Sequence, residues 1–422
     1  MPKELPIVVI VGGGFGGLAA ARSLKRAPVK VILIDRTNHH LFQPLLYQVA
    51  TAVLAPCQIA SPLRGILSSS ENTTVILGTV TGVDLASKAV IVDNQDRTAV
   101  HIAYDYLILA TGQTHSYFGH DEYEQYAPGL KNISDAVAIR NKILTAFELA
   151  EAEEDPAQHK NLLTFVLVGG GPTGVEMASA IAVMVRSTLK RDFRRIDSGS
   201  ARIILIDRGS RPLHTFAEEL SEAVLKRLQK LGVEVISGAG VDSIDAEGVI
   251  VRGQRIASET VIWTAGVTPS PAGRWLNTET DRAGKVKVQP DLSVRDCPGV
   301  FVVGDTAFQE QDGKPLPGVA QVAIQQGHYV GRLIDRVVKQ KSPPAPFRYF
   351  DKGNLAVVGK GYAILQSGKL RIRGYIAWLV WAAIHLQFLA QSSLRATVLV
   401  QWIWTYWTNQ RGSRLIVKHR SE

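Results

Sequence analysis

The fold is decided by two stretches that repeat one pattern, VIVGGGFGG at residues 9–17 and VLVGGGPTGVE at residues 166–176. In each, a short apolar run leads into glycines spaced G-x-G-x-x-G and then into a helix-like segment. This order predicts a buried parallel strand, a tight turn and a helix whose free N–H groups point at a phosphate. A protein that holds one dinucleotide needs one such turn, so two turns predict two dinucleotides.

The first turn carries three glycines with separate physical tasks. Gly12 allows the tight turn, Gly14 lets a pyrophosphate approach the backbone, and Gly17 lets the helix pack on the strand. The next strand, KVILID, ends in Asp35, whose carboxylate can accept hydrogen bonds from a ribose. A lone glycine pattern is weak evidence, but strand, turn, helix, strand and acid in this order are specific. A glycine-rich turn without a ligand is the alternative.

The second turn repeats this arrangement with Gly169, Gly171 and Gly174, and the next strand, ARIILID, ends in Asp207. An acid at this strand end favours NAD, whose ribose carries no phosphate. The spacing from Gly174 to Asp207 is unusually long, because a basic, polar segment, RSTLKRDFRRIDSGS, is inserted between them.

Three charged side chains near the second turn can each be interpreted in more than one way. Arg208 and Arg211 follow the strand-end acid, and arginine can bind a 2′-phosphate, so NADPH is the alternative to NADH. Glu176 is expected in the first turn of the helix, where it either contacts the nicotinamide or ribose or is a carboxylate favoured by the helix dipole.

Two later strands identify the first dinucleotide. YDYLILATG ends in Thr111-Gly112, and PGVFVVGDTA ends in Gly304-Asp305, an acid at a strand's carboxyl end that suits the ribityl chain of a flavin. Together these features resemble the two-dinucleotide flavoproteins, which include glutathione-reductase-like enzymes. The resemblance implies an α/β fold with two Rossmann-like domains, in which the FAD domain is split around the NAD domain.

The resemblance also implies domain limits and cofactor-binding residues. The expected domains are 1–115 and 268–345 for non-covalent FAD, 116–267 for NADH, and 346–422 as a C-terminal membrane-anchoring domain of amphipathic helices. The FAD-binding residues expected are Gly12, Gly14, Phe15, Gly17, Asp35, Arg36, Thr111, Gly112, Gly304 and Asp305. The NADH-binding residues expected are Gly169, Gly171, Gly174, Glu176, Asp207 and Gly266.

A sharper resemblance lies in four further segments. HLFQPLLYQVATA, GVAQVAIQQGHYVG, YFDKGNLAVVGKGYAIL and the ending from Trp404 to Ile416 are similar to the type II (alternative) NADH dehydrogenases. These are single-chain, non-pumping NADH:quinone oxidoreductases of bacterial and mitochondrial membranes. The Ala-Gln-x-Ala-x-Gln quinone motif of that family maps to residues 320–325. The residues expected at the quinone are Thr51, Ala320, Gln321 and Gln325, with Glu176 and Gln321 as the catalytic pair.

We therefore expect two electrons to pass from NADH through FAD to a membrane quinone, without a metal. A sulfide:quinone oxidoreductase is the nearest alternative, and it needs catalytic cysteines beside the flavin. Only Cys57 and Cys297 are present, too far apart in sequence for a Cys-x-x-Cys site or a local disulfide. A membrane-bound flavoprotein redox sensor is the alternative from another class.

The composition of the C-terminal segment suggests contact with an anionic membrane surface. Of the formal charge of +9, the segment from Lys369 onward contributes eight Lys or Arg against one acid. Five of the seven tryptophans lie in two apolar stretches, 375–390 and 396–407, the first of which is too short to span a bilayer. We expect two helices lying in one leaflet over anionic lipid, with a buried hairpin or homodimer interface as the alternative. No nucleic-acid motif accompanies the charge. The N-terminal MPKELP leaves no room for a presequence, so the cytoplasmic face of a bacterial inner membrane is the expected location.

Overall fold

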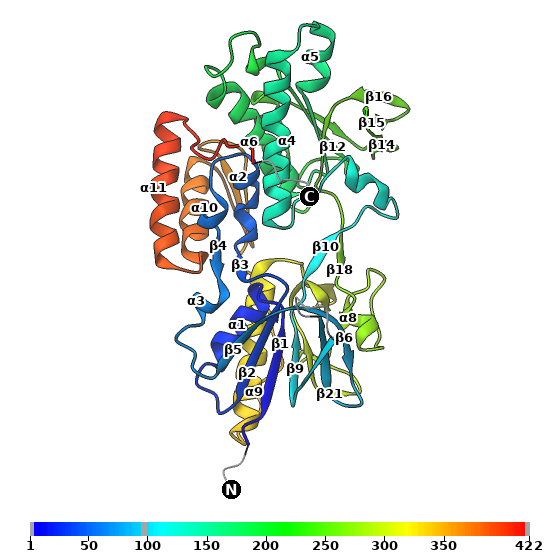
Figure 1. Ribbon diagram of the computed structural model, residues 1–422, viewed down its shortest axis with the longest axis vertical. Helices are drawn as coiled ribbons and strands as arrows, with labels where there is room; N and C mark the ends of the chain where they lie inside the picture. The colour runs from blue at the N-terminus through cyan, green and yellow to red at the C-terminus, as the bar shows by residue number, and fades with distance from the viewer. Residues whose placement is uncertain (1–3, 94–98, 418–422) are drawn as a thin grey trace. The chain divides into compact units, whose positions relative to one another are not determined.

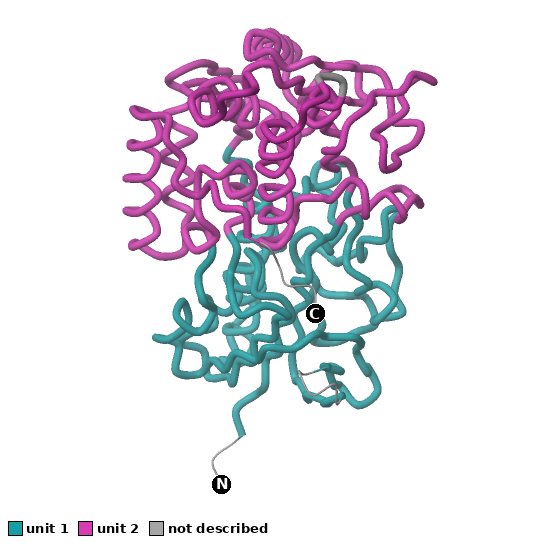
Figure 2. The backbone as a smooth tube through the Cα atoms, turned by 45° about the horizontal axis from the view of Figure 1, so that its top comes forward, with its two compact units in different colours: residues 1–41, 60–114, 267–352 teal, residues 42–59, 115–266, 353–422 magenta. Residues whose placement is uncertain are grey.

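The computed structural model describes residues 4–93 and 99–417 and divides the chain into two compact units. Unit 1 comprises residues 1–41, 60–114 and 267–352, and unit 2 comprises residues 42–59, 115–266 and 353–422. Figure 2 draws unit 1 in teal and unit 2 in magenta. Segments 42–59 and 353–422 thus group with the second glycine turn. The four expected domain limits remain a prediction.

Unit 1 is built on a six-stranded sheet in the order β20-β21-β9-β1-β2-β5 (Figure 1). These strands are β20 (Ser293–Val294), β21 (Cys297–Val302), β9 (Tyr106–Leu109), β1 (Ile7–Val11), β2 (Lys30–Asp35) and β5 (Thr73–Leu77). All neighbours are parallel except β20 and β21. The central strands β1 and β9 are short, apolar and largely buried, as covered parallel strands are, whereas the edge strand β5 exposes Thr74 and Leu77.

The two faces of this sheet have different covers. Alternate residues of β1, Val8 and Ile10, pack in one core with α1 (Phe15–Leu24) and α9 (Ala320–Val338). Val9 and Val11 pack on the other side against the antiparallel sheet β6 (Thr79–Asp84), β7 (Ala89–Asp93) and β8 (Ala99–Ala103). α1 and α9 lie very close, since a Cβ at Gly327 would stand 2.1 Å from the carbonyl oxygen of Gly16.

Unit 2 is built on a four-stranded parallel sheet in the order β13-β12-β11-β17. These strands are β13 (Val233–Ser237), β12 (Arg202–Asp207), β11 (Thr164–Val168) and β17 (Thr260–Trp263). The helices with this sheet are α4 (Ile133–Ala152), α5 (Pro156–Leu162), α6 (Pro172–Val183) and α7 (Glu218–Lys230). α6 continues into one π-helical turn, Met184–Thr188. The apolar stretch 261–271 does not form one continuous strand, because β17 ends at Trp263 and β18 (Val267–Pro269) is separate.

The remaining segments of unit 2 form smaller elements. An antiparallel sheet is made by β14 (Ser243–Asp245), β15 (Gly248–Val251) and β16 (Gln254–Ala257), and another by β25 (Asn354–Val357), β26 (Ala363–Ser367) and β27 (Leu370–Gly374). The helices are α2 (Leu46–Ala50), α10 (Tyr375–Phe388) and α11 (Ser392–Thr408). α10 and α11 lie side by side (Figure 1), with the rings of Trp381 and Trp402 5.2 Å apart. Within the described residues, neither these nor any other helix combines the length and apolar character that crossing a membrane requires.

Candidate functional site

The first glycine turn has the geometry of a phosphate cradle in unit 1. Gly12 has φ +101°, and a Cβ there would stand 2.4 Å from the carbonyl oxygen of Ala110. A Cβ at Gly17 would stand 1.8 Å from the carbonyl oxygen of Gly12, so only glycine permits this contact of helix and strand. A Cβ at Gly14 would meet no atom within 4 Å. The turn is therefore tight where the chain packs and open where a pyrophosphate would approach the start of α1.

Asp35 stands at the end of β2 and fixes this turn. Its Oδ2 accepts a hydrogen bond of 2.6 Å from the backbone N–H of Gly13, and its Oδ1 accepts from the N–H and the hydroxyl of Thr37. A carboxylate oxygen can accept more than one bond, so a ribose contact remains compatible with this geometry. Phe15 meets the ring of His40 edge-on at 5.2 Å, and Arg36 is exposed.

The two later strand ends also meet within unit 1. The hydroxyl of Thr306 donates to the carbonyl oxygen of Gly112, and that of Thr111 is hydrogen-bonded to Ser270. Gly304 has φ +73° and begins the 3₁₀ turn Gly304–Thr306, which contains Asp305. The structure therefore brings Thr111, Gly112, Gly304 and Asp305 together at the carboxyl edge of one parallel sheet, where open α/β sheets bind ligands.

The second glycine turn reproduces the first in unit 2. Gly169 has φ +116°, and a Cβ at Gly174 would stand 1.9 Å from its carbonyl oxygen, while a Cβ at Gly171 would meet nothing within 4 Å. Asp207, at the end of β12, lies against this turn, since its Oδ2 would stand 2.4 Å from a Cβ at Gly170. That Oδ2 is buried and has no hydrogen-bond partner among the described residues. An unpaired buried carboxylate oxygen beside the turn fits a ribose hydroxyl as its missing donor.

The two arginines that follow Asp207 are both engaged elsewhere in unit 2. The guanidinium of Arg211 pairs with Glu218 at 3.2 Å, and that of Arg208 lies 5.9 Å from the ring centre of Phe118. Gly266 has φ +73°, and a Cβ there would clash with Phe118 at 2.5 Å. The exposed ring of Phe118 can move, but a Cβ at Gly266 would also stand 2.8 Å from the carbonyl oxygen of Ser116, so the turn and this backbone contact both require glycine.

Glu176 lies one turn further into α6 than expected. The helix begins at Pro172, so no acid occupies its first turn, and the helix-dipole interpretation of Glu176 loses its basis. Burial raises its pKa to about 8, and the one hydrogen bond that opposes this shift is from the N–H of Val357 to its Oε1, at 3.3 Å. The carboxyl group is therefore largely protonated at neutral pH and can donate as well as accept a hydrogen bond.

The raised pKa of Glu176 makes the stability of the protein depend on pH. In the unfolded chain this carboxyl ionises near its ordinary pKa of 4.5, whereas in the folded chain it holds its proton up to about pH 8. The folded state binds this proton more tightly than the unfolded state does. The protonated carboxyl group of Glu176 therefore stabilises the fold fully below pH 4.5, and this stabilisation is lost as the pH rises to 8. We expect Glu176→Gln to remove a fall of about 3 kcal/mol in the free energy of unfolding between pH 5 and pH 8.

Urea unfolding of the FAD-loaded protein at the two pH values measures this difference. Glu222→Gln is the matched control, because Glu222 is exposed on α7. A Glu176→Gln variant that keeps the full pH dependence of the wild type would assign that dependence to other groups.

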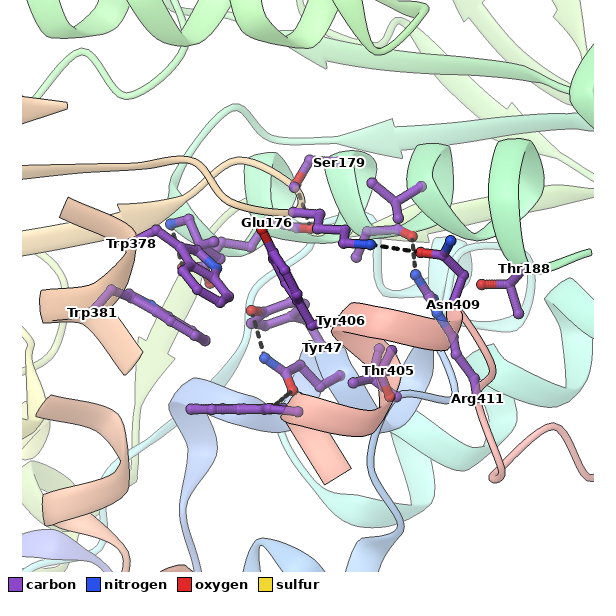
Figure 3. A pocket seen from close by; sticks show the side chains of 18 residues that line it. Tyr47, Glu176, Ser179, Thr188, Trp378, Trp381, Thr405, Tyr406, Asn409 and Arg411 are labelled. Atoms are coloured by element: carbon purple, nitrogen blue, oxygen red, sulfur yellow. Dashed lines mark hydrogen bonds between the residues drawn. The ribbon is translucent and has the colours of Figure 1, made fainter. Parts of the chain in front are cut away.

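A pocket in unit 2 was not predicted from the sequence. It has a volume of about 120 Å³ and is lined by aromatic side chains of α2, α10 and α11 together with Glu176 (Figure 3). Trp402 donates through Nε1 to Oε1 of Gln48 at 2.7 Å, and Gln48 donates through Nε2 to the hydroxyl of Tyr47 at 2.9 Å. This chain of bonds orients Tyr47, whose pKa is raised well above 10 first by burial and then by Glu176.

Arg411 enters the same pocket and is buried without a carboxylate partner among the described residues. Its guanidinium donates to the carbonyl oxygens of Thr51 at 2.6 Å and Ala180 at 3.3 Å. Burial, and to a smaller extent the nearby charge of Arg414, lower the pKa of Arg411 to about 9. The C-terminal segment is thereby attached to α2 and α6. Arg411 is one of the eight Lys and Arg of the C-terminal segment that we expected over anionic lipid, and the structure corrects this for Arg411, which is only 4% exposed.

The expected quinone residues lie in both units. In unit 1, Ala320 and Gln321 begin α9, and Oε1 of Gln321 accepts from the N–H of Lys352 at 3.3 Å and from the hydroxyl of Tyr349 at 3.5 Å. The amide of Gln325 both donates to and accepts from the backbone of Phe350. Gln325 thus fixes the segment that follows α9. The quinone motif did not predict this structural role.

Thr51 follows α2 in unit 2 and is fully buried. Its hydroxyl donates to the carbonyl oxygen of Tyr47 at 2.9 Å. The side chain is therefore bonded within its own helical turn, and its expected contact with a quinone remains a prediction.

Gln326 is a buried polar residue that the motif did not single out. Its Oε1 accepts from the N–H of Gly304 at 2.7 Å, and its Nε2 donates to Gln309 at 3.2 Å. It is 1% exposed and connects α9 to the turn that holds Asp305. The only feature of the sequence that could have indicated this role is that Gln326 directly follows the last glutamine of the motif, Gln325.

Comparisons with known proteins identify the family to which the chain is similar. The sequence model of the pyridine nucleotide-disulphide oxidoreductase family matches residues 6–327. The type II NADH:quinone oxidoreductase Ndh of Mycobacterium tuberculosis is 45% identical, over 100% of this chain and 92% of the relative. NdhA of the same organism, also described as a type II NADH:quinone oxidoreductase, is 43% identical, over 97% of this chain and 89% of the relative.

Among solved structures, NDH2 from Plasmodium falciparum in complex with NADH has the same fold. It matches with a TM-score of 0.89 and 20% identity, over 98% of this chain and 100% of that chain. The α/β fold expected from the two glycine turns is thereby confirmed.

Proposed function

The chain belongs to the pyridine nucleotide-disulphide oxidoreductase family and, within it, to the type II NADH:quinone oxidoreductases, and we propose that it passes two electrons from NADH to a membrane quinone. The observation that carries this proposal is the pair of complete glycine turns, one in each unit, each with an acid at the following strand end. FAD, when bound, supplies the two-electron chemistry that links donor and acceptor. No proton pumping is part of the proposal.

The turn of unit 1 fits FAD. Gly12, Gly14 and Gly17 leave space for a pyrophosphate at the start of α1, and Asp35 lies beside that turn. At the other strand ends of the sheet, Asp305 and its neighbours offer polar groups to the ribityl side. The residues of unit 1 thus bind and orient the cofactor without a covalent bond.

The turn of unit 2 fits NADH better than NADPH. The unpaired Oδ2 of Asp207 can accept from a ribose hydroxyl but would repel a phosphate at that position. Of the two arginines that could neutralise a 2′-phosphate, Arg211 is paired with Glu218 and Arg208 lies near the ring of Phe118. Glu176, protonated at neutral pH, is a hydrogen-bonding group for the nicotinamide or its ribose.

Gln321 is the residue proposed to bind the quinone carbonyl. Its Oε1 is the acceptor for Lys352 and Tyr349, which presents the amide NH₂ as the donating end. Ala320 contributes only a small side chain at the start of α9. Gln325 fixes this part of the helix through its hydrogen bond to the backbone of Phe350. Thr51 belongs to the proposed set through its motif.

A sulfide:quinone oxidoreductase is the competing enzyme, and the cysteines argue against it. Cys297 is buried at the start of β21 in the core of unit 1, and burial raises its pKa, which disfavours the reactive thiolate. Cys57 is exposed and has no disulfide partner among the described residues. The direct test is reduction of a short-chain quinone by the FAD-loaded protein with NADH, NADPH or sulfide as donor. NADH is expected to be the best donor, and turnover with sulfide would overturn the proposal.

A redox-sensing flavoprotein is the competing function from another class. The presence of a quinone motif in addition to two nucleotide sites argues against it, because a sensor needs no acceptor site. Slow turnover with tight retention of NADH would support the sensor.

The surface of α10 and α11 supports attachment to a membrane. Several of its large apolar side chains are exposed, among them Ile376, Val400, Trp404 and Trp407. An apolar patch that remains exposed marks an interaction surface, and tryptophan favours the lipid interface. We therefore place the protein on the surface of a bilayer, with these two helices in one leaflet. A homodimer through the same helices is the alternative occupant of this face.

The charges of the tail contribute less to this attachment than their number suggests. Arg371 pairs with Glu219 at 3.1 Å, Arg414 pairs with Asp192, and Arg411 is buried. Since NADH is supplied by the cytosol, the cytoplasmic face of the inner membrane is the proposed location.

Val400→Asp combined with Trp407→Asp is expected to reduce binding to liposomes at least about tenfold, because a charge in an apolar contact is strongly disfavoured. Both side chains are exposed, at 66% and 79%, so the fold should tolerate the change. Co-sedimentation with vesicles measures it, and Leu149→Asp, at an exposed apolar position of α4, is the matched control. Equal binding of both variants would exclude this face as the attachment surface. A change in mass by light scattering without a change in vesicle binding would favour the homodimer.

A further inference from the structure

A basic recess in unit 2 has no part in the proposed reaction. It has a volume of about 250 Å³ and lies where the π-helical turn after α6, the last turn of α7 and the loop after β25 meet. Four cations line it: Arg186, Arg227, Lys230 and Lys360. We call these side chains and the space between them the basic recess.

The positive charge of the basic recess is not neutralised by the protein. The lining contains no Asp or Glu, and none of the four cations forms an ion pair with any described residue. Nη1 of Arg186 is buried without a hydrogen-bond partner in the described part of the chain, although Nη2 donates to the carbonyl oxygen of Gly232. Burial lowers the pKa of both Arg186 and Lys360. Gathering like charges in this way is unfavourable unless an anion joins them.

Helix stabilisation accounts for only part of this cluster. Arg227 and Lys230 lie in the last turn of α7, where cations interact favourably with the helix dipole, and Arg186 follows α6 in the same way. Arg227 also supports the structure, since it donates to the carbonyl oxygens of Val358 and Lys360. The dipole explains neither the unpaired nitrogen of Arg186 nor the presence of Lys360, which comes from a loop.

The basic recess is distinct from the nucleotide-binding turn. The glycine turn precedes Pro172, whereas Arg186 lies at the far end of the same helical segment. At 1.5 Å per residue the two ends are about 20 Å apart. A phosphate of NADH bound at the glycine turn therefore does not reach the recess.

We propose that the basic recess binds the phosphate group of an anionic phospholipid. A lipid is favoured over a free anion because the recess adjoins the aromatic pocket of unit 2, with which it shares Val183, Lys360 and Asn409. Asn409 follows the last residue of α11, and its side chain accepts a hydrogen bond of 2.9 Å from Lys360. The ammonium of Lys360 also lies 4.7 Å from the ring centre of Tyr406 on α11. The cations thus lie next to one of the two helices proposed to contact lipid, and the inference rests on that attachment.

Binding of soluble short-chain lipids to the full-length, FAD-loaded protein tests the inference. Dihexanoyl-phosphatidylglycerol below its micelle concentration, dihexanoyl-phosphatidylcholine and inorganic phosphate are titrated separately by calorimetry. We expect one saturable site for phosphatidylglycerol, and weaker binding of the other two. Lys230→Ala should weaken binding of phosphatidylglycerol about tenfold, the loss of one charge-assisted hydrogen bond. Lys226→Ala is the matched control, because Lys226 is exposed one helical turn earlier and does not line the recess.

The outcomes distinguish a phospholipid from a free anion as the ligand of the recess. They also distinguish failure of this lipid site from failure of the proposed oxidoreductase activity. Equal weakening by Lys226→Ala would show general surface charge and overturn the site. Phosphate binding as tightly as phosphatidylglycerol would assign the recess to a free anion and overturn the lipid. Lys230→Ala should leave NADH oxidation with a short-chain quinone unchanged, and the melting temperature reports folding. Failure of the lipid site thus leaves the oxidoreductase activity intact, and failure of that activity leaves the binding result valid.

Discussion

Replacing Gly171 with valine is expected to raise the KM for NADH about 100-fold or more while the melting temperature and FAD content stay unchanged. A Cβ at Gly171 would meet no protein atom within 4 Å, and the φ of −72° at this residue suits any L-residue. We therefore expect the substitution to leave the stability of the fold unchanged. The added side chain occupies the space that a pyrophosphate needs to reach the N–H groups of α6. Loss of two such charge-assisted hydrogen bonds corresponds to about this factor.

Gly14→Val is the matched variant in the other turn. Gly14 has the same open surroundings and a φ of −69°, so valine there should abolish retention of FAD instead. Steady-state kinetics and the flavin absorbance of the purified proteins measure the two effects. A Gly171→Val variant with normal KM, or one that loses FAD as Gly14→Val does, would show that the two turns are not divided between the two dinucleotides.

Gln321→Ala is expected to slow reoxidation of the reduced protein by a short-chain quinone about tenfold to 100-fold. Reduction by NADH should proceed at the wild-type rate, because the amide is proposed to act on the quinone alone. A donated hydrogen bond that strengthens as charge develops on the carbonyl contributes energy of this order. Anaerobic stopped-flow absorbance resolves the two half-reactions.

A structural role for Gln321 has to be separated from this one. Its Oε1 holds Tyr349 and the backbone of Lys352, so alanine also removes contacts to that segment. Tyr349→Phe removes the hydroxyl contact and leaves the amide. If this variant slows quinone reduction as strongly as Gln321→Ala, or if both half-reactions of Gln321→Ala slow equally, the proposed role is wrong.

Much of the fold could be predicted from the sequence because the decisive signals are local. A strand, a glycine turn, a helix and a strand-end acid lie within about one supersecondary unit, and two glycines of each turn are required by close contacts with backbone atoms. Gly17 and Gly174 show this directly, since a Cβ at either would overlap a carbonyl oxygen of its own turn. The tail helices expected within 375–390 and 396–407 are found at Tyr375–Phe388 and Ser392–Thr408, for the same reason.

The features that the sequence did not reveal depend on contacts between distant segments. Arg411 reads as one more cation of a basic tail, and only its bonds to Thr51 and Ala180 show that it is buried. Lys360 joins Arg186 in the basic recess although the two are far apart in sequence. The position of Glu176 was misjudged by one turn because the start of α6 is set by Pro172, not by the glycines before it.

The central claim is tested most directly by NADH oxidation by the purified, FAD-loaded protein in liposomes, with and without a short-chain quinone. We expect strong stimulation by the quinone, with NADPH a poor substitute for NADH. Reduction of the bound flavin by NADH without any quinone-dependent turnover would contradict the assignment of quinone as the acceptor, while leaving the fold and both nucleotide sites in place.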